Sequence, residues 1–579
     1  MLRWSSGRCN VTEGRAQEPP KRRSKWRRRA KISAIALVAL CLLGYLVSCS
    51  INWICYARPP EFNGSPKVLS QQVQESDGVR RIGRAWLSKK DGILRMYLAG
   101  DPFTLGYSNA VLTQEYIEEQ EASLIRLVKH YVPSALGRWL LKKYVLVRNR
   151  DLPSYVQRRY QLEIYGLSRG YRDPFPEIGP LYHRLLNYHA AHDISHAVMD
   201  NPLVGCTSFA AWGEATEGGH LLIGRNFDFD AGRCFDENKI VMRVEPDKGR
   251  GYISVGWPGL IGVVTGINDA KIAVSINAAQ STDNRRIGTP VSIVIRDVMQ
   301  HASTLEEAIT IIRRSQVFVT DGYLVADGKT GEAVIVEKTP LRAEVRRSTG
   351  NVLISANHFL SDALKDDPAN VRYMADGTSV ARYERMAELL AACKSPLNPH
   401  DVSVILRDRV VHGTTTPSLG HLAAINSLTA THSVIIDATA GLIWVSVYPH
   451  QLGGYVPFGL KDFEAPAGAR QIGPDPLLSD GSYQHCQDAR ERVAKAAALL
   501  DDGDRDAAVP LLDEASRLNP GLYLPYLMLG ELAFREARWT EAKSLLTKAL
   551  SLHPAYRSER ESVRKMLGQV KERLAGDGG

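Results

Sequence analysis

The residues best suited to do chemistry lie in one short segment, residues 205–230, which reads GCTSFAAWGEATEGGHLLIGRNFDFD. If the bond between Gly205 and Cys206 breaks, Cys206 becomes a chain terminus that carries a thiol and an α-amine on one residue. The reference pKa of an α-amine is about 7.7–8.0, so this amine can accept the thiol proton and return it to a leaving group. The thiolate can then attack a carbonyl carbon without a histidine partner. The competing interpretation is an inert, buried cysteine.

Signatures of other common enzyme classes are absent from the sequence. It contains no G-x-S-x-G, no G-x-x-x-x-G-K-[ST] and no H-E-x-x-H, and none of its eight cysteines forms a C-x-x-C pair. The sequence therefore excludes the usual motifs of serine hydrolases, nucleotide-binding proteins and zinc sites. We expect the chain to need neither a cofactor nor a metal ion.

The same segment resembles the N-terminal nucleophile hydrolases of the isopenicillin-N acyltransferase type, which are relatives of choloylglycine hydrolases and acid ceramidases. The resemblance is carried by GCTSFA at 205–210, GRNFDFD at 224–230, WPGLIGVVTGIND at 257–269, SINAAQ at 275–280, ISANHF at 354–359 and SVARYERM at 379–386. It covers about residues 206–450. It implies an α+β fold, a four-layer αββα sandwich, in which autocatalytic cleavage between Gly205 and Cys206 frees the nucleophile.

The resemblance also implies roles for residues next to the nucleophile Cys206. Asp228 would hold the α-amine, and Arg225, three residues earlier, would position the substrate or the thiolate. Ser208 would assist the self-processing step. The alternative for Arg225 and Asp228 is a surface ion pair.

Two asparagines and an arginine complete the site that the resemblance implies. Asn277 and Asn357 would point amide groups at the oxyanion that develops during the reaction. Their alternative role is turn formation at strand ends. Arg382 matches the arginine position of the family, although Arg385 lies one helical turn further on and could take its place.

Residues 206–452 must supply the elements that position these groups. Strand-like runs are expected at 221–224, 240–244, 252–255, 261–265 and 272–276, followed by helices at 290–302 and 304–315 and by further strands up to 432–436 and 442–447. Runs of strands, then helices, then strands predict an α+β fold with an antiparallel sheet. The preceding residues 58–205 are expected to form a mainly helical, propeptide-like segment, and 453–482 a linker.

Residues 483–575 contain an internal repeat. Five pairs of identical residues are 34 positions apart: Ala508/Ala542, Leu511/Leu545, Leu512/Leu546, Ala515/Ala549 and Pro520/Pro554. This is the period of tetratricopeptide helix pairs, so the segment resembles that family. The alternative is a generic amphipathic helical hairpin. A short array of this kind is expected to pack on the neighbouring domain or to bind a protein partner.

The N-terminus predicts a membrane anchor. Residues 1–31 form a basic tail of eleven Lys or Arg against two Glu, a difference equal to the net charge of +9 of the whole chain, so no nucleic-acid partner is expected. Residues 32–57 carry no charge and are long enough to cross a bilayer. The basic tail predicts a cytoplasmic N-terminus and a single-pass signal anchor. Lipid attachment at Cys49 and a cleaved secretory signal are the alternatives.

Together these features predict a membrane-anchored cysteine hydrolase that lies outside the cytoplasm, on the periplasmic side of a bacterial inner membrane. Its substrate would be an N-acylated small molecule or lipid with a linear amide bond. One alternative is an acyltransferase that uses the same acyl-enzyme. The other is a membrane-tethered repeat scaffold with an inactive enzyme domain.

Overall fold

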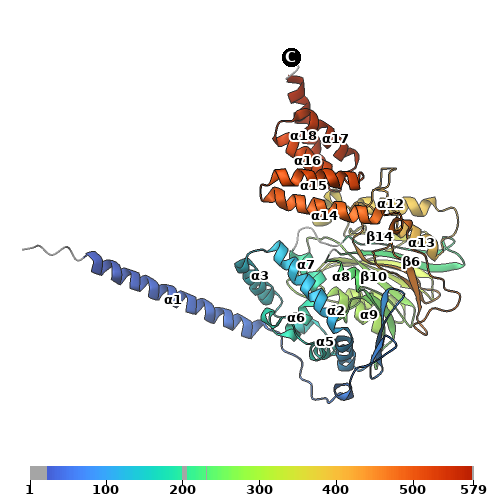
Figure 1. The fold of residues 1–579 in the computed structure, drawn as a ribbon. Helices are drawn as coiled ribbons and strands as arrows, with labels where there is room; N and C mark the ends of the chain where they lie inside the picture. The colour runs from blue at the N-terminus through green and yellow to red at the C-terminus, as the bar shows by residue number, and fades with distance from the viewer. Residues whose placement is uncertain (1–21, 199–204, 230, 577–579) are drawn as a thin grey trace, which may run out of the picture. The chain divides into compact units, whose positions relative to one another are not determined.

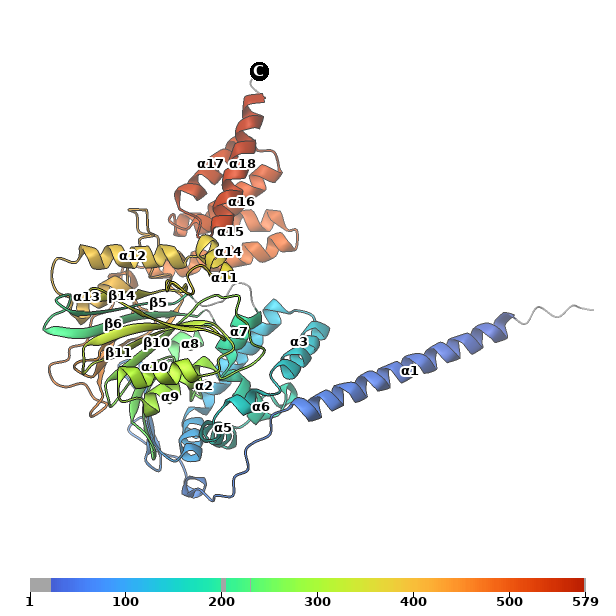
Figure 2. The same ribbon diagram turned by 180° about the vertical axis from the view of Figure 1, so that it is seen from behind.

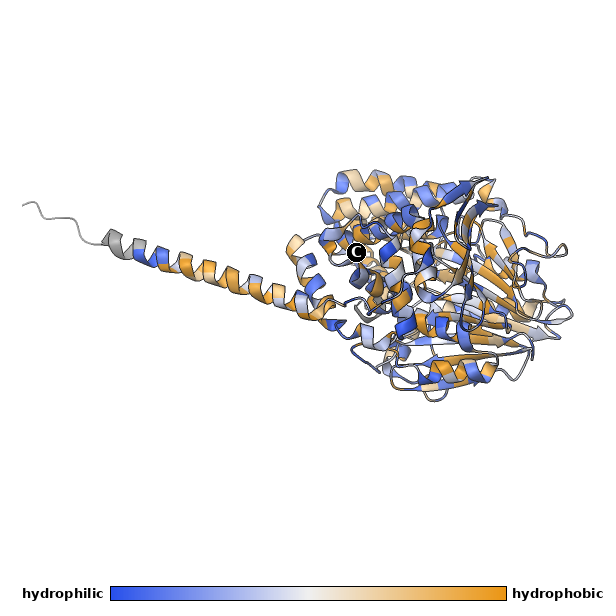
Figure 3. Ribbon diagram, turned by 90° about the horizontal axis from the view of Figure 1, so that it is seen from below, coloured by the Kyte–Doolittle hydropathy of each residue, from blue (hydrophilic) through white to orange (hydrophobic). Residues whose placement is uncertain are grey.

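A computed structural model of the chain describes residues 22–198, 205–229 and 231–576, and it divides into two compact units, residues 1–56 and 57–579. The first unit contains one described element, helix α1 (Arg22–Cys55). Its stretch Arg28–Cys55 is 28 residues long, about 42 Å at 1.5 Å per residue, and contains an 18-residue window with a mean hydropathy of 2.4. Figure 3 shows this helix as a largely hydrophobic ribbon. Its length and composition fit a membrane span or a signal sequence.

The second unit contains two β-sheets. Among the described residues, one sheet has eleven strands in the order β1-β2-β3-β4-β7-β8-β9-β10-β11-β12-β13, and the other has six in the order β14-β5-β6-β15-β16-β17. Neighbouring strands are antiparallel except β4 and β7, which are parallel. The strands of the large sheet are β1 (Gln74–Ser76), β2 (Val79–Ile82), β3 (Ala85–Lys90), β4 (Ile93–Gly100), β7 (Ile240–Pro246), β8 (Tyr252–Gly256), β9 (Thr265–Asn268), β10 (Ile272–Ala278), β11 (Asp321–Asp327), β12 (Glu332–Lys338) and β13 (Ala343–Arg347). Those of the small sheet are β5 (Thr207–Gly213), β6 (Gly219–Asp228), β14 (Val352–Ser355), β15 (Ala430–Asp437), β16 (Leu442–Ser446) and β17 (Tyr455–Gly459).

The two sheets share a hydrophobic core. Ile253 and Ile267 of the large sheet belong to the same buried cluster as Ile223 and Val434 of the small sheet. Helices α9 (Val291–His301) and α10 (Leu305–Arg314) contact the large sheet, whereas α12 (Ser379–Ala392) and α13 (Pro399–Leu406) contact the small one. The helices and sheets can be followed in Figures 1 and 2. The α+β class with antiparallel pairing is therefore as the sequence predicted.

The segment before Cys206 contains strands that the sequence analysis did not anticipate. Its helices are α2 (Pro102–Tyr131), α3 (Ala135–Arg148), α4 (Leu152–Tyr155), α5 (Arg158–Gly170), α6 (Leu181–Tyr188) and α7 (Ala191–Val198). Residues 74–100, however, form β1 to β4, and β4 joins this segment to the sheet of the catalytic region. Charged residues obscure the strand pattern, since Arg95 in β4 is buried, pairs with Asp91 and lies over the ring of Phe458.

Two expected boundaries were wrong. The expected linker 453–482 contains strand β17, which pairs with β16 and is fully buried. Its Pro457 is tolerated because β17 is the outermost strand of its sheet, where a missing N–H costs no ladder bond. The strand expected at 261–265 begins only at Thr265, because the carbonyl of Val264 is bound by Arg225 instead of a neighbouring strand.

The C-terminal residues form a helical region, defined here as α14 (Ser482–Asp501), α15 (Arg505–Leu518), α16 (Tyr523–Arg535), α17 (Trp539–Ser551) and α18 (Arg557–Gly576). Consecutive helices pack against each other. Leu512 and Leu546, which are 34 residues apart, are both fully buried, as are Ala508, Ala515 and their partners at the same offset. The assignment to a particular repeat family stays a prediction.

Candidate active site

Cys206 lies immediately before β5 and is completely buried. Its Sγ is 3.8 Å from Nη2 of Arg225 on the neighbouring strand β6. Burial raises the pKa of the Cys206 thiol, and the Arg225 guanidinium opposes that rise by favouring the thiolate. Just before it, the Gly205 N–H donates to the carbonyl of Asp228 at 3.1 Å. The predicted nucleophile and its two predicted neighbours therefore lie together.

Asp228, the last residue of β6, presents one unpaired carboxylate oxygen to this junction. Its Oδ1 accepts from the hydroxyls of Ser427 at 3.3 Å and Thr429 at 3.2 Å. Its Oδ2 is buried and has no hydrogen-bond partner among the described residues. A Cβ built on Gly205 would lie 4.0 Å from this Oδ2, so the free oxygen is close to the Gly205–Cys206 peptide.

Neighbouring groups act in opposite directions on the pKa of Asp228. Burial raises its pKa to about 6, while Arg382, the two hydroxyls and Arg225 oppose that rise. A carboxyl group with this pKa is ionised at neutral pH and ready to pair with a cation. An α-ammonium on Cys206 would supply such a cation.

The guanidinium of Arg225 is fixed from several sides. It donates to the carbonyl of Val264 at 2.6 Å, to the Thr265 hydroxyl and to the carbonyl of Ile276. It also lies over the ring of Phe227, 4.6 Å from the ring centre. Because these contacts hold it in place, Arg225 offers a preorganised positive charge beside the thiol.

Of the two candidate arginines on α12, Arg382 enters the site. Its Nη1 donates to the carbonyl oxygen of Cys206 at 2.6 Å, and its Nη2 donates to Oδ1 of Asn357 at 2.6 Å. Arg385 instead forms a bidentate ion pair with Asp408, at 2.9 Å for each bond. Of the two arginines that the sequence offered, Arg382 is therefore the one that contacts Cys206.

The two predicted asparagines lie in the same buried network. Asn277, near the end of β10, donates to the Ser208 hydroxyl at 2.9 Å and to the carbonyl of Ser355 at 3.0 Å. Asn357 donates to the carbonyl of Ala278 at 2.9 Å. Their amide nitrogens therefore already have protein partners, and a role at the oxyanion stays a prediction.

Sequence reasoning missed several residues around the site. His432 of β15 is buried, its Nε2 is 3.0 Å from the Thr265 hydroxyl, and its ring stacks on Phe227. Burial lowers the pKa of His432 well below its usual range, so this imidazole is neutral. Ser427 and Thr429 were missed as well, because two hydroxyls in a loop form no recognisable motif.

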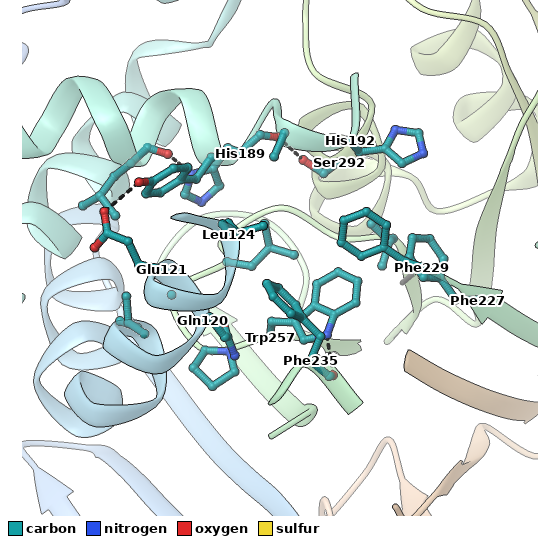
Figure 4. Close-up of a pocket in the computed structure, with 18 residues that line it drawn as sticks. Gln120, Glu121, Leu124, His189, His192, Phe227, Phe229, Phe235, Trp257 and Ser292 are labelled. Atoms are coloured by element: carbon teal, nitrogen blue, oxygen red, sulfur yellow. Dashed lines mark hydrogen bonds between the residues drawn. The ribbon is translucent and has the colours of Figure 1, made fainter. Parts of the chain in front are cut away.

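Figure 4 shows a largely apolar pocket of about 130 Å³. Phe227, whose ring lies under Arg225, lines it together with Phe229, Phe235 and Trp257. The segment before Cys206 supplies the opposite wall, including Leu124 of α2 together with residues of α6 and α7. The pocket can therefore accept an apolar group. Within the described ranges, no cluster of three or more His, Cys, Asp or Glu could hold a metal ion.

Residues 215–417 match the family of acyl-coenzyme A:6-aminopenicillanic acid acyl-transferase. This match supports the resemblance to the N-terminal nucleophile hydrolases that the motifs indicated.

Curated relatives match the chain in part. An uncharacterized protein of Archaeoglobus fulgidus is 27% identical over 259 residues, 42% of this chain and 42% of the relative. The N-acylethanolamine-hydrolyzing acid amidase of Caenorhabditis elegans is 25% identical over 46% of this chain and 72% of its own length. Acid ceramidase of Balaenoptera acutorostrata scammoni is 23% identical over 21% and 36%. The chain thus spans about two fifths of the length of the archaeal relative.

Solved structures with a partial likeness include the Caenorhabditis elegans acid amidase ortholog, 20% identical, with a TM-score of 0.29 over 40% of this chain and 93% of that one. A mutant of the conjugated bile acid hydrolase from Clostridium perfringens is 14% identical, with a TM-score of 0.29 over 42% and 89%.

Proposed function

We propose that this protein is a membrane-anchored cysteine amidohydrolase that activates itself by cleavage before Cys206. The observation that carries the proposal is the buried Oδ2 of Asp228 beside the Gly205–Cys206 bond, which has no hydrogen-bond partner in the part of the chain that the structure describes. A buried carboxylate oxygen without a donor is costly, and an α-ammonium created at Cys206 would satisfy it. The residues that surround the bond are those that such chemistry requires.

In the maturation step, the Cys206 thiol attacks the carbonyl carbon of Gly205 and replaces the peptide nitrogen, which takes up the thiol proton. Water then hydrolyses the resulting thioester, leaving a carboxylate on Gly205 and a free amine and thiol on Cys206. Arg225 stabilises the thiolate, and Arg382 holds the Cys206 carbonyl so that the bond stays aligned.

In the mature enzyme, the α-amine removes the thiol proton, and the thiolate attacks the carbonyl carbon of the substrate amide. The amine then returns the proton to the leaving nitrogen, and water releases the acyl group from Cys206. Asp228 keeps the α-amine oriented through both half-reactions. In this scheme Asn277 and Asn357 turn an amide group toward the oxyanion.

The apolar pocket lined by Phe227 supports the proposed substrate class. Aromatic side chains line it, which suits an acyl chain, while the amine part of the substrate would lie on the other side of the thiol. The names of two relatives, an N-acylethanolamine-hydrolyzing acid amidase and an acid ceramidase, fit an N-acylated small molecule or lipid. If water is excluded, the same acyl-enzyme can pass its acyl group to an amine, which keeps the acyltransferase alternative open.

We further propose that the two sheets and their outer helices form the four-layer αββα arrangement of this enzyme type. The core shared by both sheets supports this assignment. In the same proposal α1 anchors the chain with the catalytic unit outside the cytoplasm, which the basic residues before the apolar stretch favour.

The purified full-length protein tests the proposal. It should separate into two fragments on a denaturing gel, and mass spectrometry should find a fragment that begins at Cys206. The same protein should release the free carboxylic acid, a fatty acid or a bile acid, from at least one member of a panel of N-acylethanolamines, ceramides, N-acyl amino acids and bile-salt amides.

Two variants sharpen this test. Cys206→Ala should remove both the cut and the activity, whereas the control Cys393→Ala, which deletes an exposed thiol, should retain both. A protein that is fully active yet uncut would contradict the α-amine mechanism. A protein that is neither cut nor active would favour the scaffold alternative.

A further inference from the structure

The hydroxyls that bind Asp228 come from a short loop, residues 427–429, which we call the donor loop. Ser427 and Thr429 both donate to Oδ1 of Asp228, and their hydroxyls lie 2.7 Å from each other. These hydroxyls are the side chains that contact the buried carboxylate among the described residues. The position of the loop therefore decides whether Asp228 keeps its donors.

The residue between the two donors is held by the C-terminal helical region. Leu428 has a left-handed backbone with φ of 56°, a conformation that a leucine adopts only when its surroundings enforce it. Its carbonyl accepts from Nη1 of Arg490 on α14 at 3.1 Å. Its side chain is buried in a cluster with Leu452, Leu477 and Cys486, the last of these also on α14.

Other contacts join the same helices to the catalytic region. Asn519 donates to the carbonyl of Leu419 at 3.0 Å, a few residues before the donor loop. The backbone N–H of Ser558, at the start of α18, donates to Asp376 at 2.7 Å. Asp376 ends helix α11 (Pro368–Asp376), directly before the helix that carries Arg382. Figure 2 shows α11, α12 and α14 close to one another.

We propose that the C-terminal helical region is a working part of the catalytic site, with Arg490 and Leu428 as positioning residues that keep the donor loop on Asp228. This inference rests on the proposed function, because it assigns to the helices a role in the reaction at Cys206. Of the two expectations for this segment, it follows from packing on the neighbouring domain and does not need a protein partner. It also implies that the catalytic region cannot work at full rate without them.

The pH dependence of the reaction should report on the donor loop. Among the described residues, the charged or titratable groups that act on Asp228 are Arg382 from α12, Arg225 from β6 and the Cys206 thiol. The two hydroxyls favour the ionised carboxylate, so loss of the loop contact leaves the proton more tightly bound. The acid limb of kcat/KM should then move to higher pH.

Arg490→Ala is the primary variant, and Arg492→Ala on the same helix is its matched control. Arg492 pairs with Glu514 and donates to the backbone carbonyl of Asp488, both within the helical region, so it should not affect the donor loop. We expect Arg490→Ala to lower kcat/KM about 5-fold to 20-fold, mainly through kcat, and to shift the acid limb upward. Arg492→Ala should behave like the parent in both respects, and Arg490→Lys should recover part of the loss.

A double-variant comparison separates positioning from general stability. In a protein that already carries Ser427→Ala and Thr429→Val, Arg490→Ala should cause no further shift of the acid limb, because the donors it positions are gone. If Arg490→Ala lowers the melting temperature but leaves the pH midpoint unchanged, or matches Arg492→Ala throughout, the inference is overturned.

A second readout needs no substrate. The pH profile of alkylation of Cys206 by iodoacetamide, followed by mass spectrometry of the peptide that contains it, should differ between Arg490→Ala and the parent and be the same for Arg492→Ala and the parent. An alkylation profile that Arg490→Ala leaves unchanged would overturn the inference. If the parent neither cuts itself nor hydrolyses any N-acyl amide, the proposed function fails, while this profile still decides whether the donor loop depends on α14.

Discussion

Replacing Asp228 with asparagine should stabilise the uncleaved protein at neutral pH while it destroys catalysis. In the fold, burial raises the pKa of this carboxyl from 3.8 to about 6, so ionisation inside the protein is unfavourable. The folded state therefore binds a proton more tightly than the unfolded state. Asp228→Asn keeps the size of the side chain and removes the charge that the fold must accommodate.

The sign and size follow from proton linkage. For a carboxyl whose pKa is raised on folding, stability is highest below about pH 4 and falls as the pH rises towards the folded-state value near 6. A rise of this size corresponds to at most about 3 kcal/mol, and about 1–3 kcal/mol is a realistic range. Above pH 7, Asp228→Asn should therefore be more stable than its parent by about this amount, and near pH 4 the two should be alike.

The assay compares thermal or denaturant unfolding at pH 4, 5, 6, 7 and 8. Both proteins carry Cys206→Ala, so that neither is cut and no α-ammonium forms. The control Asp362→Asn removes an exposed carboxyl whose pKa is lowered by Lys365, so any pH-dependent difference that it gives should have the opposite sign. A stability difference between Asp228→Asn and its parent that is constant from pH 4 to 8 would refute the reasoning. In the otherwise unmodified protein, the same substitution should lower kcat/KM about 10²-fold or more.

Three further predictions concern other parts of the chain. Arg382→Ala should reduce activity about 10²-fold or more, because its contact with the Cys206 carbonyl is lost, whereas Arg385→Ala should remain within about threefold of the parent. Equal losses of activity in kinetic assays of the two variants would contradict the assignment of Arg382 to the site. Glu163→Gln leaves the buried Arg296 without its counter-charge and should cost about 3 kcal/mol in denaturant unfolding; a cost below about 1 kcal/mol would show that the pair is dispensable. A reporter fused after Gly579 should be active only outside the cytoplasm, and cytoplasmic activity would reverse the proposed orientation.

The parts of the site that could be predicted from sequence are those that lie in ordered motifs. Cys206, Arg225 and Asp228 are close in sequence and adjacent in space because two paired strands, β5 and β6, carry them. Arg382 was predicted together with Arg385, and the two are distinguished by the contact of Arg382 with the Cys206 carbonyl and by the ion pair of Arg385 with Asp408. The ion-pair partner of Arg385 lies 23 residues further along the chain, and helix spacing alone does not reveal such a partner.

The parts that could not be predicted depend on contacts between distant segments. Ser427 and Thr429 reach Asp228 across about 200 residues of chain, so no local pattern marks them. The strands within residues 74–100 were missed because they are short and contain buried charges such as Arg95. β17 was missed because glycine and proline usually indicate a loop, a rule that fails at an outer strand.

The parallel pairing of β4 with β7 has a consequence for how the mature enzyme persists. If the chain is cut before Cys206, the two fragments still share a continuous ladder of backbone hydrogen bonds from Leu94 to Gly100. The two fragments would then stay in a one-to-one ratio, because both come from a single polypeptide. Fragments could not exchange between molecules unless the hydrogen bonds between β4 and β7 were broken. Solubilised fragments made separately should fail to reassemble, since the first fragment would expose unpaired strand edges. The lifetime of the cleaved enzyme would then be limited by the first dissociation of its two fragments, which is irreversible. An equilibrium between bound and free fragments would not be reached.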